Sequence, residues 1–329
     1  MSVTKYIKAL LNPYQSYLKL RLKSKRAWIN KNCKSFYDVF EYEKDNDFSY
    51  TKLKAKLSLG CEIDLENPRT FNEKLIHRRL FSRDPIWPVI TDKIAVRDWL
   101  KEQGYLDHVH LVPAKVAYSV EELMEIPIDR PVVVKAAWAS GMNLFVSSNK
   151  ELEAYKSTLE NWLKSPYAPE RLIWAPEEMQ RGFLVEDSIA DEDGNVPLDY
   201  KFHCFNGRVE FLQVDIDRFK QHKRLMFSRE GELLDWIYGK EKYSDNFDLN
   251  SRLIQQLALV AEKLSENFSY IRVDLYCYKS KIYFGELTQT QGAGFEKFSS
   301  PELNCFYGNK WIYPESNKLG DLLITGIEL

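Results

Sequence analysis

The sequence predicts an α+β protein in which two β-hairpin regions with packed helices follow a mainly helical N-terminal portion. Residues 270–295 contain two runs of alternating apolar and polar side chains, the period of a half-buried strand, joined by a short polar turn. Residues 199–218 predict a second hairpin, because Asn206-Gly207 is the strongest short-range signal for a hairpin turn. Residues 251–268 place apolar side chains at helical spacing, which predicts an amphipathic helix behind the strands.

The length and composition indicate a globular protein with a large core. A chain of 329 residues with 44% hydrophobic side chains suits one large domain, or two to three subdomains around a shared cleft. The formal net charge of −2 argues against a general nucleic-acid binder. We expect no membrane-spanning segment and no signal peptide. The five cysteines form neither a zinc pattern nor a disulfide framework, so we expect a cytoplasmic location. The oligomeric state is not indicated.

Residues 1–34 form a basic N-terminal extension. No acidic residue precedes Asp38, and the basic residues of the extension are Lys5, Lys8, Lys19, Arg21, Lys23, Lys25, Arg26, Lys31 and Lys34. One interpretation is an electrostatic contact with an acidic polymer or with anionic lipid at the inner face of the membrane. The other, which we favour, is a solvated arm or a helix docked on its own domain.

Residues 35–112 are expected to be mainly helical. The helix candidates are residues 50–58, residues 71–81, and a segment that opens at residues 91–93 and runs through Leu100. Thr70 or Asn72 is available as the N-cap of the second candidate. Taken by itself, Lys93 is a solvent-facing charge at the start of the third.

Residues 113–190 are expected to form a subdomain with a phosphate-binding loop. Residues 131–135 indicate a buried strand that ends in Lys135, and a short returning strand follows the small-residue loop at 136–143. Within this loop, Ser140-Gly141 supplies flexibility. A lysine beside such a loop suits a triphosphate, because backbone N–H groups wrap the oxygens while the ammonium neutralises charge. A plain β-hairpin turn is the alternative.

Charged residues on two further strand candidates are possible site residues. Glu186 lies near the end of a strand that leaves the 113–190 subdomain. In the remaining portion, residues 191–329, Lys201 lies on one strand of the predicted hairpin and Arg218 ends the other. The alternatives are a surface carboxylate at a strand end and a solvated basic edge, respectively.

The hairpin within residues 270–295 carries the most informative charges. Arg272 and Asp274 project from one face of its first strand, while Glu286 has the side-chain parity of Phe284 on the second. We expect antiparallel pairing to bring Asp274 and Glu286 together on one side of the sheet. Two close carboxylates repel unless a cation lies between them, and Mg²⁺ takes one or two carboxylates together with phosphate oxygens. The ordinary solvated face of a structural hairpin is the alternative.

These motifs resemble the ATP-grasp ligases. RVD, a short gap, then GEL and a glycine-containing loop are similar to the metal-binding hairpin of that superfamily. FGELTQTQGAGF together with DYKFHCFNGRVEFLQVDIDR resembles its teichuronopeptide-biosynthesis (TupA-like) branch. The resemblance covers roughly residues 70–310. It implies an ATP-grasp-type fold in which two α+β subdomains, the nucleotide clasp at 113–190 and a catalytic metal-binding subdomain at 191–329, enclose a nucleotide.

The resemblance also implies the cofactors, ATP and Mg²⁺, and roles for individual residues. It implies nucleotide contacts from Lys93, Lys135, Ser140, Gly141 and Glu186, metal ligands in Asp274, Glu286 and Thr288, and contacts to the γ-phosphate or the acyl phosphate from Arg272, Lys201 and Arg218. Thr288 stands where the superfamily often has an asparagine ligand, and a hydroxyl is the weaker ligand.

The activity that the resemblance implies is amide formation from a carboxylate and an amine through an acyl phosphate. The branch further implies that an amino acid or amine is attached to a uronic acid of a bacterial surface polysaccharide such as a capsule, O-antigen or teichuronopeptide. Two alternatives stay open: a kinase that phosphorylates a hydroxyl of a sugar or other small molecule, and a nucleotide-binding scaffold without turnover.

Overall fold

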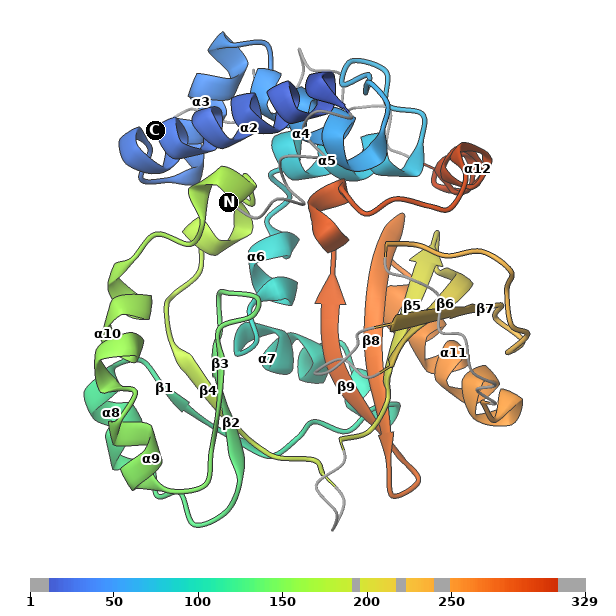
Figure 1. Ribbon diagram of the computed structural model, residues 1–329. Coiled ribbons are helices and arrows are strands. Elements are labelled where there is room, and N and C mark those ends of the chain that lie inside the picture. The colour runs from blue at the N-terminus through green and yellow to red at the C-terminus, as the bar shows by residue number, and fades with distance from the viewer. Residues whose placement is uncertain (1–11, 191–195, 217–222, 240–248, 313–329) are drawn as a thin grey trace.

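The structure is a computed structural model that describes residues 12–190, 196–216, 223–239 and 249–312. Within these residues a group of helices lies across one end of the molecule, and two antiparallel sheets extend from it side by side (Figure 1). Arg218, one of the predicted site residues, lies outside the described residues.

The helices at this end, the helical cap, come from the N-terminal part of the chain. They are α2 (Pro13–Asn32), α3 (Phe36–Asp45), α4 (Ser49–Leu59) and α5 (Phe71–Phe81), and α12 (Pro301–Lys310) packs beside α5. Ile29, Phe36, Ala55 and Phe81, one from each helix, are buried in one apolar cluster. The predicted helices at 50–58 and 71–81 are confirmed, and residues 13–32 form a helix docked on the cap.

Side-chain caps fix where these helices begin. The Thr70 hydroxyl accepts a hydrogen bond from the Glu73 N–H at 3.3 Å, and the Glu73 carboxylate accepts one from the Thr70 N–H at 2.9 Å. This pair of hydrogen bonds is a capping box at the start of α5. At the start of α4 the Glu43 carboxylate accepts hydrogen bonds from the N–H groups of Tyr50 and Thr51, at 2.9 and 2.7 Å. Glu43 thereby satisfies backbone donors that have no partner within the helix.

The first sheet has four strands, in the order β1-β4-β2-β3. Its strands are β1 (Ala114–Ala117), β4 (Phe183–Asp187), β2 (Val132–Ala136) and β3 (Asn143–Val146). The helices α8 (Val120–Glu125), α9 (Asn149–Glu153) and α10 (Lys156–Lys164) lie along its outer side (Figure 1). A turn at residues 154–155 separates α9 from α10.

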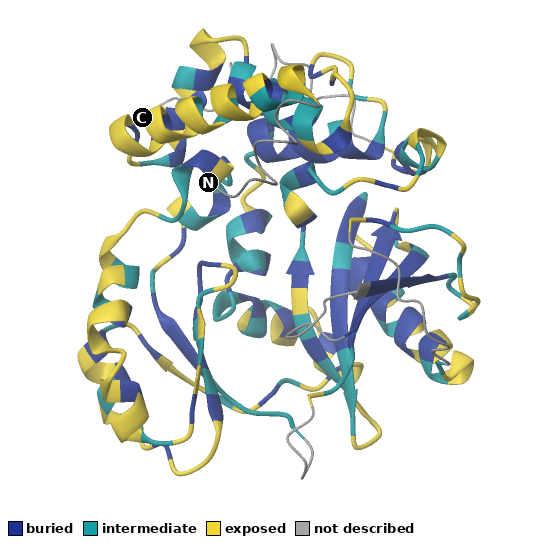
Figure 2. Cartoon of the chain, viewed as in Figure 1, coloured by how far each residue is buried: buried dark blue, intermediate teal, exposed yellow. Residues whose placement is uncertain are grey.

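The second sheet has five strands, in the order β7-β6-β5-β8-β9. Its strands are β7 (Lys223–Phe227), β6 (Arg208–Ile216), β5 (Asp199–Phe205), β8 (Tyr270–Tyr278) and β9 (Lys281–Thr288). The amphipathic helix α11 (Ser251–Ser265) packs on it through Leu257, Ala261 and Leu264, as predicted. Figure 2 shows its central strands as the most continuously buried part of the chain, which makes this sheet the stiffer support for a site.

Two short helices, α6 (Ile86–Thr91) and α7 (Ala95–Glu102), run between the two sheets (Figure 1). The helix expected to open at residues 91–93 instead begins at Ala95, and Lys93 lies in the turn before it. The reason is Asp92, whose carboxylate accepts hydrogen bonds from the N–H groups of Ile94 and Ala95 at 2.7 and 3.1 Å. Lys93 is therefore presented from a turn.

Short 3-10 turns complete the described elements. They are η1 (Tyr105–Asp107), η2 (Pro169–Arg171), η3 (Ala175–Glu177) and η4 (Gln291–Gly294). Across the described ranges, each helix falls short of the length and apolar character required to cross a lipid bilayer.

Candidate active site

A cavity of about 530 Å³ lies between the two sheets and under the helical cap. The predicted site residues that line it are Lys93, Lys135, Ser140, Glu186, Lys201, Arg272, Asp274, Glu286 and Thr288. Gly141 turns the loop beside Ser140, with φ of +80°, but lies outside the cavity wall. The fold thus brings residues from distant parts of the chain to one cavity.

A β-bulge on β9 decides which way Glu286 points. Asp274 pairs with Glu286, but the next residue, Leu275, pairs with Phe284, so Gly285 is an extra residue on β9. Strict alternation places Glu286 on the side of Phe284, which is buried in the core. The bulge instead turns Glu286 to the side of Asp274. A side chain at position 285 has no room there, since its Cβ would lie 2.9 Å from the Asp274 carbonyl oxygen.

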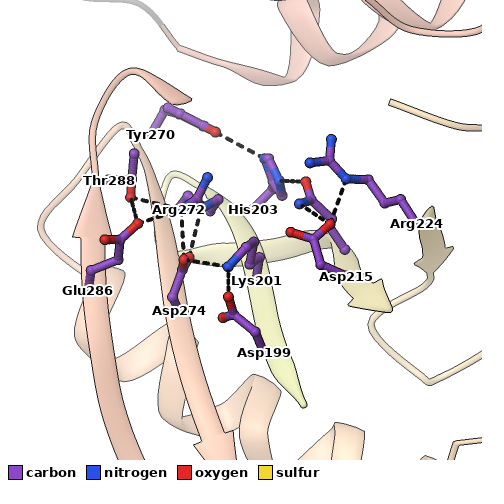
Figure 3. Close-up of polar contacts among 11 residues, drawn as sticks. Asp199, Lys201, His203, Asp215, Arg224, Tyr270, Arg272, Asp274, Glu286 and Thr288 are labelled. Carbon is purple, nitrogen blue, oxygen red and sulfur yellow. Dashed lines mark hydrogen bonds and ion pairs between the residues drawn. The ribbon is translucent and has the colours of Figure 1, made fainter. Parts of the chain in front are cut away.

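Arg272 joins the two carboxylates. Its Nε and Nη2 donate to the two carboxylate oxygens of Asp274, both at 2.7 Å, and Nη2 also reaches Glu286 at 2.7 Å (Figure 3). The Thr288 hydroxyl donates to Glu286 at 2.9 Å. Burial by itself lowers the pKa of Arg272, but the adjacent carboxylates outweigh it and hold this pKa well above its usual value. The guanidinium is therefore a fixed positive charge in the cavity wall.

Lys201 on the neighbouring strand extends this network inward. Its ammonium forms ion pairs with Asp199 and with Asp274, the latter at 3.0 Å, and all three side chains are almost fully buried. Burial lowers the pKa of Lys201, while Asp274 and Asp199 raise it to a net value above the usual one. Lys201 therefore stays charged and fixes the position of Asp274.

A second polar chain continues across the same sheet. His203 Nδ1 lies 3.0 Å from the Tyr270 hydroxyl, and its Nε2 lies 3.4 Å from Gln213. Gln213 donates to Asp215 at 3.1 Å, and Arg224 donates to the same carboxylate at 2.8 Å (Figure 3). Burial, followed by the charge of the nearby Arg272, lowers the pKa of His203 well below its usual value. The imidazole is neutral at pH 7 and serves as a hydrogen-bonding link within the sheet.

The residues of this wall fit a magnesium ion. The three carboxylates of Asp199, Asp274 and Glu286 face the two cations of Lys201 and Arg272, which leaves one formal negative charge in excess. Two carboxylates beside a threonine hydroxyl are oxygen donors of the kind that Mg²⁺ accepts. The described residues contain no group of three or more His, Cys, Asp or Glu side chains with the geometry of a metal site. Ligand phosphate oxygens and water would therefore complete the coordination.

The opposite wall carries a simpler ion pair. Lys135 at the end of β2 contacts Glu186 on β4, and Glu186 also lies 3.3 Å from Arg97 of α7. Arg97 is held in turn by a hydrogen bond to the Val112 carbonyl at 2.7 Å. With Arg97 as a second partner for Glu186, Lys135 can turn to another anion without leaving a carboxylate unpaired.

Lys93 holds the small-residue loop. Its ammonium donates to the carbonyl oxygens of Ala136 and Ala139, at 3.0 and 2.5 Å. Burial lowers the pKa of Lys93, and the carboxylate of Glu286 acts in the opposite direction. The Ser140 N–H donates to the Tyr167 hydroxyl at 3.0 Å. The loop is thus fixed from both sides in a conformation that lines the cavity.

The sequence reasoning missed three residues of this site. Asp199 was findable, because it precedes Lys201 by two positions and so faces the same side of the strand. Arg97 and Tyr167 gave no such signal, since each meets its partner only through the tertiary fold.

Comparison with known proteins places the chain in a family. The sequence profile of the family described as TupA-like ATPgrasp matches residues 73–312, well over half of the chain. No curated protein matches the chain.

Several solved structures are similar to this chain. The D-alanine–D-alanine ligase from Bacillus anthracis complexed with ATP has 14% identity and a TM-score of 0.38, over 72% of this chain and 64% of that one. The L-amino acid ligase from Bacillus licheniformis has 14% identity and a TM-score of 0.39, over 62% and 44%. The D-alanine–D-alanine ligase from Helicobacter pylori has 16% identity and a TM-score of 0.39, over 68% and 61%. The match spans less than two thirds of each of these proteins. On the family match, this chain belongs to the TupA-like ATP-grasp family and has the ATP-grasp fold.

Proposed function

We propose that the protein is an ATP-dependent carboxylate–amine ligase that works through an acyl phosphate. The observation that carries this proposal is the single cavity in which Asp274, Glu286 and Arg272 on one wall meet Lys93 and Lys135 on the other. Carboxylates that accept a divalent cation, together with lysines that neutralise phosphate, are the groups that phosphoryl transfer needs. The family match supports the same chemistry.

In the proposed complex, the wall formed by β2 and β4 holds the nucleotide. Lys135 turns from Glu186 to the phosphates, and Arg97 remains as the ion-pair partner of Glu186. The Glu186 carboxylate then contacts the adenine amino group or the ribose. Lys93 and the backbone around Ser140 neutralise and surround the phosphates from the loop side. We assign Gly141 a conformational role and no direct contact with the nucleotide, because it permits the turn at positive φ.

The wall formed by β8 and β9 carries out the chemistry. Asp274, Glu286 and Thr288 would hold Mg²⁺, which would neutralise the negative charge of the phosphates. Arg272 stabilises the transferred phosphoryl group and the oxyanion that develops on the acyl carbon, because its guanidinium is a fixed positive charge in the cavity wall. Lys201 keeps Asp274 in position from behind. A contact from Arg218 stays a prediction.

The proposed reaction has two steps. A carboxylate oxygen of the acid attacks the γ-phosphorus of ATP, and the bond to the β-phosphate oxygen breaks with release of ADP. The amine nitrogen then attacks the acyl carbon, the bond to the phosphate oxygen breaks, and the nitrogen loses a proton as the amide forms. The protein mainly positions the reactants and neutralises charge.

We further propose a uronic acid as the carboxylate and an amino acid or amine as its partner, in the synthesis of a bacterial surface polysaccharide. The resemblance of residues 199–218 and 284–295 to the teichuronopeptide branch supports this choice. The proposed functional units remain the nucleotide clasp at 113–190 and the catalytic subdomain at 191–329, with the helical portion at 35–112 before them.

For the N-terminal extension we favour a helix docked on its own domain, as α2 is, and a peripheral contact with anionic lipid through α2 is the alternative. This helix has no acidic residue, and Lys19, Arg21 and Lys23 are exposed on it beside Tyr17 and Leu20. Cations interspersed with exposed aromatic and aliphatic side chains are typical of helices that lie on a lipid surface. The contact would keep the enzyme at the inner face of the membrane, near a growing polymer.

The test is a screen of uronic acids against amino acids, with phosphate release as the first measurement. A ligase releases phosphate only when ATP, the acid and the amine are all present. Replacing the amine by hydroxylamine traps the acyl phosphate as a hydroxamate, which a kinase acting on a hydroxyl does not form. ATP binding without turnover in any combination would support the scaffold and contradict the ligase.

A further inference from the structure

A group of cations lines the end of the cavity that lies under the helical cap. Lys54 of α4 and Arg171 of η2 both face the same cavity as Asp274 and Glu286. Lys54 lies outside residues 73–312, the part of the chain that matches the family. The mechanism proposed above uses neither of these cations.

Arg79 of α5 supports this group from behind. It is 5% exposed, and its Nη1 donates to the Arg171 carbonyl at 2.5 Å. Its Nε and Nη2 have no hydrogen-bond partner among the described residues. The Phe295 ring contacts both cations, with its centroid 4.4 Å from the Lys54 ammonium and 5.0 Å from the Arg79 guanidinium. An aromatic face lessens the cost of bringing two cations together but neutralises neither.

The nearby carboxylates are already engaged. Glu170 forms an ion pair with Arg26 at 2.6 Å. Glu43 accepts two backbone hydrogen bonds at the start of α4. Within the described ranges, Lys54, Arg79 and Arg171 therefore have no ion-pair partner. Arg171 is exposed to solvent, but Arg79 is buried and Lys54 is half-buried, and such cations are costly without a counter-ion. This cost indicates that an anion from outside the chain belongs beside Lys54 and Arg79.

We propose that Lys54 and Arg171, with Arg79 behind them, bind a second anionic group of the carboxylate substrate, separate from the carboxylate that is activated. This inference rests on the proposed ligase function, because it assigns one end of the same cavity to the substrate. The anion is a carboxylate or a phosphate on a neighbouring part of that substrate. A polymer of uronic acids or a sugar phosphate supplies such a group.

A hydrogen-bonded link connects this subsite to the phosphate loop. Arg171 Nη1 donates to the Tyr167 hydroxyl at 2.9 Å, and the same hydroxyl accepts the Ser140 N–H at 3.0 Å. An anion that draws Arg171 further into the cavity therefore acts on Tyr167, the residue that contacts Ser140 of the loop. The subsite thus shares Arg171 with the hydrogen-bonded link that positions the nucleotide loop.

The ionisation of Lys54 supports the same assignment. Burial lowers the pKa of Lys54 to about 8, with Arg79, Arg26 and Arg171 acting in the same direction and Glu170 in the opposite one. A bound anion favours the charged form and raises this pKa. Anion affinity should therefore be full below pH 8 and fall as the pH rises above it, with proton uptake on binding near pH 8.

Calorimetry of the full-length protein with three probes tests the proposal. Methyl glucuronide carries one carboxylate, digalacturonate carries two, and glucuronate 1-phosphate carries a carboxylate and a phosphate. We expect at least one doubly charged probe to bind about tenfold more tightly than the single carboxylate, the effect of one added charge-assisted contact. Which of the two does so separates a carboxylate subsite from a phosphate subsite. Equal affinity for all three probes would overturn the proposal.

Substitutions then locate the preference. Lys54→Met keeps the packing on Phe295, and Arg171→Gln keeps a hydrogen-bond donor. Each should remove most of the preference for the doubly charged probe. Lys54→Arg should retain that preference above pH 8. Lys56→Met is the matched control on α4, because Lys56 is paired with Glu62 and does not line the cavity. ATP affinity should be unchanged in the three lysine variants, whereas Arg171→Gln also removes the hydrogen bond to Tyr167 that leads to the nucleotide loop and is not a control for ATP binding. If the wild type does not bind ATP, the ligase proposal is wrong. If Lys54→Met keeps the preference for the doubly charged probe, only the subsite proposal is wrong.

Chemical labelling supplies a second measurement that does not need the natural substrate. At pH 8 an amine-reactive acetylating reagent should modify Lys54 faster than Lys56, since a larger fraction of Lys54 is neutral. Citrate should slow the labelling of Lys54 but not of Lys56. Equal labelling of the two lysines, or no protection by citrate, would count against the subsite.

Discussion

The two sheets that enclose the cavity treat charge in opposite ways. On the four-stranded sheet, Lys135 and Glu186 form one ion pair, with side chains 29% and 13% exposed. On the five-stranded sheet, Lys201 and Asp274 are 6% and 2% exposed and belong to a continuous network that includes Arg272. The first arrangement can open for a ligand at little cost, whereas the second is fixed before any ligand arrives.

This difference suggests a division of labour between the sheets. In the proposed function, the groups that exchange partners when a nucleotide enters lie on the four-stranded sheet, whose ion pair is the more exposed one. In the same proposal, the groups that must hold their geometry during phosphoryl transfer lie on the five-stranded sheet, where removing Asp274 or Lys201 leaves an uncompensated buried charge. Substitutions on the two sheets should therefore have different consequences for folding and for activity.

The largest effect is expected from Asp274→Asn, compared with Glu286→Gln on the adjacent strand. Both should lower ATP turnover at saturating magnesium by about 10²–10³-fold, as when one charge-stabilising group is removed. Asp274→Asn should also lower the free energy of unfolding by about 3–5 kcal/mol, because it leaves Lys201 and Arg272 short of a buried partner. Glu286→Gln should leave stability nearly unchanged, since its side chain is 48% exposed.

Turnover assays and urea denaturation distinguish these outcomes. If Glu286→Gln keeps more than about a tenth of wild-type turnover, its assigned role in phosphoryl transfer is wrong. If Asp274→Asn is as stable as the wild type, the network is not the rigid support that the comparison requires.

Gly285→Ala tests whether the bulge sets the geometry of the five-stranded sheet. The new Cβ would lie 2.8 Å from the Tyr276 ring and 2.9 Å from the Asp274 carbonyl, so β8 and β9 must separate or slip. We expect a loss of about 1–3 kcal/mol in unfolding free energy and a clear fall in turnover. Wild-type values for both quantities would show that Glu286 does not depend on the bulge.

Lys135→Ala tests the more adaptable sheet. ATP affinity should fall about tenfold or more while adenosine affinity changes little, because the lost partner is phosphate. Stability should change by less than about 1 kcal/mol, since the pair is partly exposed and Arg97 still contacts Glu186. Calorimetry with both ligands is the measurement, and Lys115→Ala, an exposed lysine on β1, is the control. Equal weakening of ATP and adenosine would mean that Lys135 shapes the strand instead.

The smallest effect is expected on vesicle binding by α2, a helix that has no part in the proposed reaction. Removing the helix would uncover Ile29 and confuse binding with stability, so charge substitution is the better test. On the docked-helix interpretation that we favour, the protein does not co-sediment with anionic vesicles. On the lipid-contact alternative it does so at low salt, and changing Lys19, Arg21 and Lys23 together to glutamine reduces the binding by roughly 1 kcal/mol per cation before screening. Activity on a substrate in solution should not change. The control replaces Lys150, Lys156 and Lys164, which are exposed on α9 and α10, with glutamine. If this control loses vesicle binding to the same extent, α2 has no specific role in the binding.

The sequence by itself determined most of the local structure. Alternation predicted β8 and β9, the Asn206-Gly207 turn predicted the hairpin of β5 and β6, and helical spacing predicted α11. Periodicity is a property of neighbouring residues, so it can be read without knowing the fold. The motifs around Asp274 and Glu286 indicated the family for a similar reason, since they lie within one contiguous hairpin.

Tertiary structure alone decided how these pieces became a site. The bulge at Gly285 reversed the parity of Glu286, because a register shift depends on the pairing of two strands and not on alternation along one. Lys93 came to hold a loop more than 40 residues away in the chain, and Lys54 and Arg171 came to share a cavity with Asp274. Such contacts are chosen by packing over long sequence distances, where many pairings satisfy the same local pattern and only the assembled core selects one.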